Sequence, residues 1–101
     1  MTRHGLSIPD SALRDFCRQN DIRRLALFGS VLTPAFRPDS DVDMLVDFEP
    51  GRRVGLLTLS RLERELSALF GRAIDLRTPS ELCRYFRDEV LRASEVCYAQ
   101  G

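Results

Sequence analysis

Leu25-Ala26-Leu27-Phe28-Gly29-Ser30 is the stretch that decides the fold, together with Asp41-Val42-Asp43, which begins after ten further residues. The apolar run that ends at a glycine is typical of a buried strand, so Ile22 to Phe28 is predicted to be a strand. Gly29 allows the backbone to approach a ligand closely, or it only permits a turn with positive φ. Ser30 adds a hydroxyl and an N–H group at a turn, and such a corner suits phosphate oxygens.

Two carboxylates stand at the start of the next predicted strand. Val42, Met44, Val46 and Phe48 alternate there with Asp41, Asp43, Leu45 and Asp47. Residues two apart on a strand point to the same face, so Asp41 and Asp43 aim at one spot. Two such charges repel without a cation, and Mg²⁺ typically takes one or two carboxylates plus substrate phosphates. The alternative is an acidic pair at a strand end that is merely solvated.

Asp75 is a third carboxylate of interest, because it lies inside the short apolar run Ala73 to Leu76. We predict a third strand there. A carboxylate in such a run is costly to bury unless it is coordinated or hydrogen-bonded. The alternative is an edge-strand residue that faces water.

Three helices follow from the spacing of apolar residues. They are predicted from Pro9 to about Gln19, through Leu56 to Leu69 with an end near Gly71, and from the Thr78-Pro79 start to about Ser94. The last helix places Leu82, Phe86 and Val90 on one face, which we assign to the core. Ser30 to Ser40 reads as a loop with one helical turn at its start. The order of elements predicts a small mixed α/β (α+β) sheet of about three strands flanked by helices, one domain over residues 1–101.

Composition excludes several classes of function. The 15 basic residues are all Arg and balance 15 acidic ones, so Schiff-base and P-loop lysine chemistry is excluded and direct nucleic-acid binding is not expected. The three cysteines are widely spaced without a Cys-x-x-Cys pair, which argues against a zinc site. The chain has neither the ~20-residue apolar run of a membrane span nor the apolar segment of a signal peptide. We therefore expect a cytoplasmic protein that does not associate with a membrane.

The chain resembles the DNA polymerase beta-like nucleotidyltransferase superfamily, and its minimal nucleotidyltransferase branch in particular. The signature is Gly29-Ser30, ten residues, then Asp41-x-Asp43, and the resemblance covers nearly the whole chain. The supporting segments are Leu27-Phe28, Arg37-Pro38-Asp39-Ser40, Leu45-Val46-Asp47-Phe48, Ile74-Asp75-Leu76 with Thr78-Pro79, and Val90-Leu91-Arg92 before Tyr98.

The resemblance implies a role for each matching residue. Gly29 and Ser30 would bind the β- and γ-phosphates of ATP, and Arg37 is the remaining basic residue of the loop. Asp41, Asp43 and Asp75 would hold two Mg²⁺ ions, with Asp75 also deprotonating the attacking hydroxyl. Members of this branch are often antitoxins encoded beside a HEPN-type toxin, and some transfer AMP to a tyrosine of that toxin. The resemblance thus implies an adenylyltransferase that modifies, and forms an oligomer with, such a partner.

A second reading is an antitoxin that neutralises its toxin by contact, with a weak or lost active site. It is favoured by Val31-Leu32-Thr33-Pro34, where family members often carry an Arg-Ala-Arg-Gly-like run. Guanidinium groups there would bind phosphate, so Val31→Arg is predicted to tighten triphosphate binding. A third reading, transfer to a small molecule, requires an acceptor pocket for which about a hundred residues leave little room.

Overall fold

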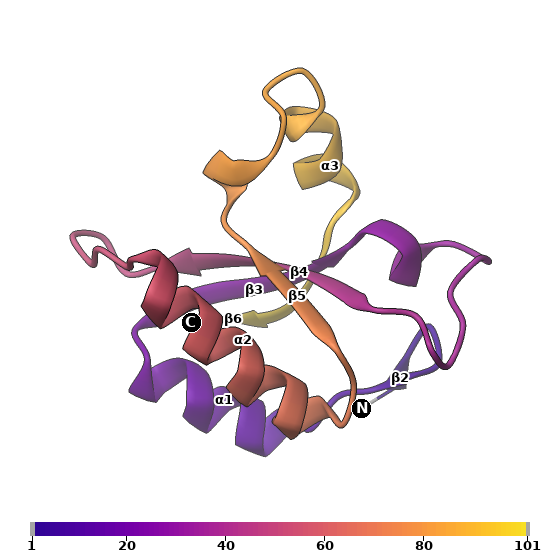
Figure 1. Ribbon diagram of the computed structural model, residues 1–101, viewed down its shortest axis with the longest axis horizontal. Coiled ribbons are helices and arrows are strands. Elements are labelled where there is room, and N and C mark those ends of the chain that lie inside the picture. The colour runs from indigo at the N-terminus through magenta and orange to yellow at the C-terminus, as the bar shows by residue number, and fades with distance from the viewer. Residues whose placement is uncertain (1, 101) are drawn as a thin grey trace.

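The computed structural model describes residues 2–100 and shows a four-stranded mixed sheet with two helices against one face (Figure 1). The strand order is β5-β4-β3-β6. β3 (Ile22–Phe28) pairs antiparallel with β4 (Val42–Phe48) and with β6 (Glu95–Ala99), whereas β4 pairs parallel with β5 (Ile74–Arg77). The predicted fold class is confirmed, and the sheet has one strand more than the sequence suggested.

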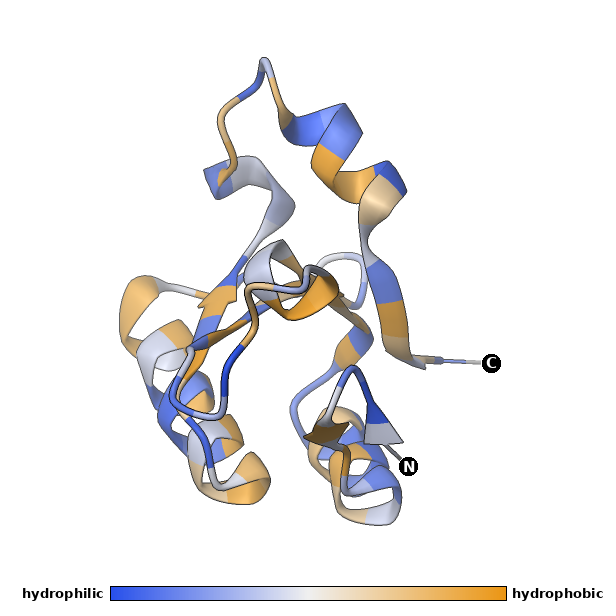
Figure 2. Ribbon diagram, turned by 90° about the vertical axis from the view of Figure 1, so that its right-hand side faces the viewer, coloured by the Kyte–Doolittle hydropathy of each residue, from blue (hydrophilic) through white to orange (hydrophobic). Residues whose placement is uncertain are grey.

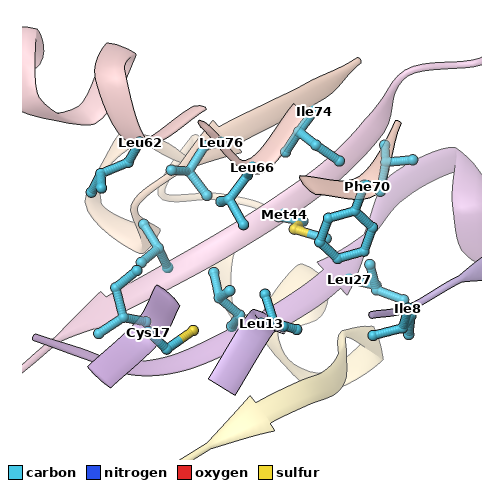
Figure 3. Packing of buried hydrophobic residues seen from close by; sticks show 14 of the residues in the cluster. Ile8, Leu13, Cys17, Leu27, Met44, Leu62, Leu66, Phe70, Ile74 and Leu76 are labelled. Atoms are coloured by element: carbon cyan, nitrogen blue, oxygen red, sulfur yellow. The ribbon is translucent and has the colours of Figure 1, made fainter. Parts of the chain in front are cut away.

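The hydrophobic core fills the space between the sheet and the helices α1 (Asp10–Gln19) and α2 (Leu56–Phe70). Alternate residues of β4, which include Met44, face this core because successive side chains of a strand point to opposite faces. They meet Leu13 of α1 and Leu66 of α2, each at most 1% exposed (Figure 3). The carboxylate of Asp43 therefore belongs to the opposite face of the sheet.

The ends of these elements agree closely with the apolar spacing of the sequence. α2 ends at Gly71, which has the left-handed conformation (φ 67°) that commonly terminates helices. The predicted helical turn at the start of the long loop is present as the 3₁₀ turn η1 (Gly29–Leu32). Among residues 2–100, no helix is long and apolar enough to cross a membrane.

The predicted C-terminal helix from Thr78 to Ser94 is wrong in its first half. The structure has the 3₁₀ turn η2 (Pro79–Glu81), an irregular segment, and only then α3 (Arg87–Ala93). The Arg87 guanidinium donates to the carbonyl oxygens of Ser80 (3.3 Å) and Leu82 (3.1 Å). A continuous helix would use these oxygens to accept backbone N–H groups, so the side chain stabilises a bend in its place.

The assignment of Leu82, Phe86 and Val90 to the core is therefore also wrong. Phe86 is 61% exposed, and the other two side chains are only partly buried. The segment that carries η2 and α3 stands on the side of the sheet opposite α1 and α2, as both views show (Figures 1 and 2).

Three further strands were missed from the sequence. β6 follows α3 directly and adds an edge strand beside β3. The strands β1 (Thr2–Arg3) and β2 (Leu6–Ser7) form a hairpin whose two turn residues, His4 and Gly5, both have positive φ. The ring of His4 is hydrogen-bonded to the carboxylate of Glu95, which links the hairpin to the start of β6.

Candidate active site

The glycine corner lies directly against one of the predicted carboxylates. Gly29 has φ 76°, so the turn does require a left-handed residue. The glycine is also needed for space, because a Cβ atom here would lie 2.3 Å from Oδ2 of Asp43. The backbone N–H of Ser30 is near enough to the Asp43 carboxylate to lower the pKa of that group. The group that approaches Gly29 in this structure is Asp43, and the close approach of a phosphate to this glycine stays a prediction.

Asp43 and Asp75 are neighbours across two parallel strands. Asp43 of β4 is paired in register with Asp75 of β5, so both side chains project from the same face of the sheet. Arg77 lies two residues further along β5, and its Nη2 atom is 3.4 Å from Oδ2 of Asp75. β5 is an edge strand, and the Asp75 side chain is 37% exposed and accepts a hydrogen bond from Arg77, so both its solvation and its hydrogen bonding are only partial.

The environment of Asp43 disfavours its charge. Burial raises the pKa of this carboxyl above its ordinary value, and the negative charges of Asp75 and Asp41 raise it further. The Arg77 guanidinium and the Ser30 N–H group act in the opposite direction, but the net pKa shift is upward. A cation beside Asp43 would reverse this balance, because it favours the ionised carboxylate.

Asp41 lies one residue before β4 and is exposed. The loop that leads to it is held by Arg72, a residue that the sequence reading did not select. Nη2 of Arg72 donates to the carbonyl oxygens of Arg37 (2.9 Å) and Ser40 (2.6 Å). Its guanidinium also lies over the ring of Phe36, 4.5 Å from the centroid. Arg72 thus fixes the backbone immediately before Asp41.

The outer edge of β5 is held in a similar way by α2. Ser67 accepts the N–H of Ile74 at 3.0 Å, and Glu63 accepts the N–H of Leu76 at 2.8 Å. These donors flank Asp75 and have no neighbouring strand to pair with, because β5 is the edge of the sheet. Glu63 and Ser67 are spaced i, i+4, so the sequence places them on one helix face. It does not indicate that they accept backbone N–H groups of β5.

Arg37 and the position of Val31 were both expected to bear on nucleotide binding, and neither lines the cavity beside Gly29. Arg37 borders a hollow that it shares with Phe36 and Arg72, and it is not among the residues that line the cavity beside Gly29. Its role in nucleotide binding stays a prediction. Val31 is fully buried in the core, so the expectation that an arginine at this position would reach phosphate is not compatible with the fold.

Magnesium was expected to bind Asp41, Asp43 and Asp75. Among residues 2–100, no three His, Cys, Asp or Glu side chains are close enough together to hold a metal by themselves. The arrangement nevertheless fits the chemistry of Mg²⁺, which usually binds through one or two carboxylates and completes its shell with water and substrate phosphates. Asp43 and Asp75 provide two adjacent oxygen ligands, and a triphosphate at Gly29 would lie beside them.

Two cavities flank the pair of carboxylates. One, of about 210 Å³, lies between α2 and β5 and is bordered by Asp75, Leu56 and Glu81. The other, of about 720 Å³, lies between η1 and α3 and is bordered by Gly29 and Val90. The first cavity borders β5 and the second borders the end of β3, and β4 with Asp43 lies between these two strands in the sheet.

These features coincide with a known family. The chain matches the family model described as a nucleotidyltransferase domain over residues 10–97. It belongs to this nucleotidyltransferase family. Protein adenylyltransferase MntA of Thermococcus cleftensis is 42% identical over 77 residues, which are 76% of this chain and 74% of that protein. The glycine corner and all three carboxylates, Asp41, Asp43 and Asp75, lie within the residues that match this family model.

Solved structures share the fold. One, described as a candidate minimal nucleotidyltransferase, has 36% identity and a TM-score of 0.67, with 88% of this chain and 87% of that chain covered. Another contains a tri-AMPylated Shewanella oneidensis HEPN toxin in complex with an MNT antitoxin. It has 15% identity and a TM-score of 0.64 and covers 90% of this chain and 70% of that chain, so the likeness concerns the fold alone.

Proposed function

We propose that this protein is a cytoplasmic, Mg²⁺-dependent adenylyltransferase that transfers AMP from ATP to a hydroxyl group of a partner protein. The partner would be a HEPN-type toxin, its acceptor a tyrosine, and the protein would act as the antitoxin. The proposal is supported by the relationship to a protein adenylyltransferase and by the fold shared with the antitoxin of an AMPylated toxin complex.

One observation carries the proposal: Asp43 is in register with Asp75 and in contact with Gly29. The proposed phosphate site at Gly29 thus lies directly beside two carboxylates, Asp43 and Asp75, whose negative charge is only partly neutralised. Bound Mg²⁺ would supply charge neutralisation for the triphosphate and for the departing pyrophosphate. Asp41, Asp43 and Asp75 would hold the metal together with water and oxygens of the triphosphate.

The reaction would be a displacement at the α-phosphorus. The acceptor hydroxyl oxygen forms a bond to phosphorus while the bond between the α-phosphorus and the bridging oxygen breaks, and pyrophosphate leaves. Asp75 accepts the hydroxyl proton. Gly29 and Ser30 would orient the β- and γ-phosphates through backbone N–H groups, which holds the leaving group opposite the incoming oxygen.

The test is transfer to the natural partner. The protein is co-purified with the product of the neighbouring toxin gene, incubated with ATP and Mg²⁺, and the intact mass of the partner is measured. A gain of one AMP unit per modified side chain is expected with the wild type and no gain with Asp43→Asn. An unmodified partner after reaction with the wild type would contradict the proposal.

A second candidate, inhibition by contact alone, is favoured by exposed apolar side chains at the start of α2 and before α3. Leu56 and Leu57 at the start of α2 are 78% and 89% exposed, and Tyr85 before α3 is 78% exposed. Side chains of this kind are common in protein interfaces. A stable, unmodified complex in which the toxin is silenced even with Asp43→Asn would support this candidate.

A further inference from the structure

A hollow of about 410 Å³ lies apart from the candidate active site, between the β1–β2 hairpin, the loop before β4 and the end of α2. Figure 1 shows the hairpin and this loop together on the right of the molecule. His4, Phe36, Arg37 and Arg72 are among its lining residues, and none of them lines either of the two cavities described above. The volume is within the range of about 300–1,000 Å³ that is usual for small-ligand sites.

The charge of this hollow is positive. Arg37 and Arg72 line it and no Asp or Glu does, whereas carboxylates border both of the other cavities. Among residues 2–100, neither arginine forms an ion pair with a carboxylate. His4 also lines the hollow, but its ring is hydrogen-bonded to Glu95, so the positive charge comes from the two arginines. Guanidinium groups without a carboxylate partner attract anions.

The protein itself holds the Arg72 guanidinium in position. Nη2 donates to two carbonyl oxygens of the loop, and the group lies over the ring of Phe36. In the part of the chain that the structure describes, Nε and Nη1 have no hydrogen-bond partner and remain free to donate to a ligand. The backbone of Arg37 is fixed as well, because its N–H donates to Oγ of Ser40 at 3.0 Å. A group that is already ordered loses less conformational entropy when a ligand binds.

We propose that this hollow is a second anion site that binds a phosphate group, either of inorganic pyrophosphate or of a nucleotide. Guanidinium groups match the oxygens of phosphate in a bidentate manner, and two of them balance the charge of about −2 that a phosphate monoester carries near neutral pH. A ligand here would contact Arg72, which fixes the backbone before Asp41. The inference does not depend on the proposed function, because no residue that lines the hollow takes part in the proposed reaction.

The test locates the site with a ligand that consists only of phosphate. NMR spectra of the backbone amides of the whole chain are recorded during a titration with inorganic pyrophosphate. No divalent metal is added, so the carboxylates of the candidate active site oppose binding there. We expect saturable shifts at the amides of Gly5, Gly71 and Arg72, which line the hollow. Arg37→Gln should weaken the affinity by about tenfold. Arg64→Gln removes the same charge from an exposed position of α2 that does not line the hollow, and it should change the affinity little.

Arg37→Lys keeps the charge but not the planar group, so its affinity for pyrophosphate should be intermediate. The melting temperature of each variant, measured without ligand, shows that it is folded. A parallel titration with AMP distinguishes the two sources of phosphate: tighter binding of AMP than of pyrophosphate indicates a nucleotide, and weaker binding indicates the free anion.

Equal loss of affinity in Arg37→Gln and Arg64→Gln overturns the inference, because binding would then depend on net charge alone. Shifts confined to Gly29 and Ser30, or no saturable shift at the amides that line the hollow, also overturn it. Each of these results leaves the proposed function standing, since that function is tested by transfer of AMP to the partner.

Discussion

Replacement of Gly29 by alanine tests the contact between the glycine corner and Asp43. The substitution has two separate costs. A residue with a Cβ atom in the left-handed conformation costs about 1–2 kcal/mol, and Gly29 has φ 76°. The new Cβ would also lie 2.3 Å from Oδ2 of Asp43, far inside contact distance, so the carboxylate has to move. It then moves away from the Ser30 N–H group, which favours its charge, and the loss of this interaction costs about 1 kcal/mol.

Gly51→Ala is the matched control, because Gly51 has φ 85° and nothing within 4 Å of the position of a Cβ atom. It has only the conformational cost, about 1–2 kcal/mol. Gly29→Ala should therefore be destabilised by about 1 kcal/mol more than Gly51→Ala. In a domain of this size, that difference lowers the melting temperature by about 4–8 °C. Thermal unfolding followed by circular dichroism measures both values.

A double-mutant cycle assigns the extra cost to Asp43. In Asp43→Ala, the two atoms nearest to the new Cβ, Oδ2 and Cγ, are absent. The difference between Gly29→Ala and Gly51→Ala should then disappear, with a coupling energy of about 1 kcal/mol. Equal destabilisation by Gly29→Ala and Gly51→Ala in the wild-type background, or a coupling energy near zero, would refute the reasoning.

Gly29→Ala should also remove the Mg²⁺-dependent increase in melting temperature on addition of ATP, because Asp43 has been displaced.

Asp43→Asn should raise the melting temperature of the ligand-free protein, because burial and Asp75 raise the pKa of Asp43 and its charged form is unfavourable in the fold. The gain in melting temperature over the wild type should be absent below the ordinary pKa of Asp, about 3.9, and should grow as the pH rises above that value. A gain in melting temperature that does not vary with pH would show that the charge of Asp43 is not its cause. Arg72→Gln removes two hydrogen bonds from the loop before Asp41. The Mg²⁺ concentration that gives half of the ATP-induced increase in melting temperature should therefore rise several-fold. If that concentration is unchanged, Arg72 does not position Asp41. Glu63→Ala should lower the stability in urea by about 1–3 kcal/mol, because the N–H of the edge strand β5 loses its acceptor. Glu63→Gln should retain most of that stability, and Glu65→Ala, which removes an exposed ion pair, should change it little.

The sequence predicted the elements that follow simple periodicity. α1, β3, β4, α2 and β5 lie within about one residue of their predicted bounds, because their apolar positions repeat with the period of a helix or a strand. The C-terminal region failed for a definable reason. Leu82, Phe86 and Val90 have helical spacing, but the bend is stabilised by Arg87 reaching back to two carbonyl oxygens. A hydrogen bond between a side chain and one particular backbone atom produces no periodic pattern in the sequence, so it could not be predicted from the spacing of apolar residues.

In the candidate site, too, the sequence predicted the residues that are part of a local pattern and missed those that contact distant segments. Gly29, Asp43 and Asp75 were selected from local sequence, and the register of β4 and β5 does bring the two carboxylates together. Arg72 and Glu63 were missed because each acts on the backbone of a segment distant in the chain. An arginine after a helix-ending glycine and a glutamate on a helix are common in sequences, and only the fold shows which backbone atoms they bind.

The charges around Asp43 would favour a cation bound beside it. Arg77 is the positive group of this cluster, and it lies 3.4 Å from Asp75 with nearly half of its side chain exposed to solvent. Its effect on Asp43 is smaller than that of burial and of Asp75, so the pKa of Asp43 remains raised. The register of β4 and β5 keeps Asp43 beside Asp75 on the same face of the sheet. The fold therefore keeps unfavourable charge repulsion in the ligand-free state, and a divalent cation that bridges the two carboxylates would relieve it. Binding of that cation and of a triphosphate should then stabilise the fold together more than either does alone.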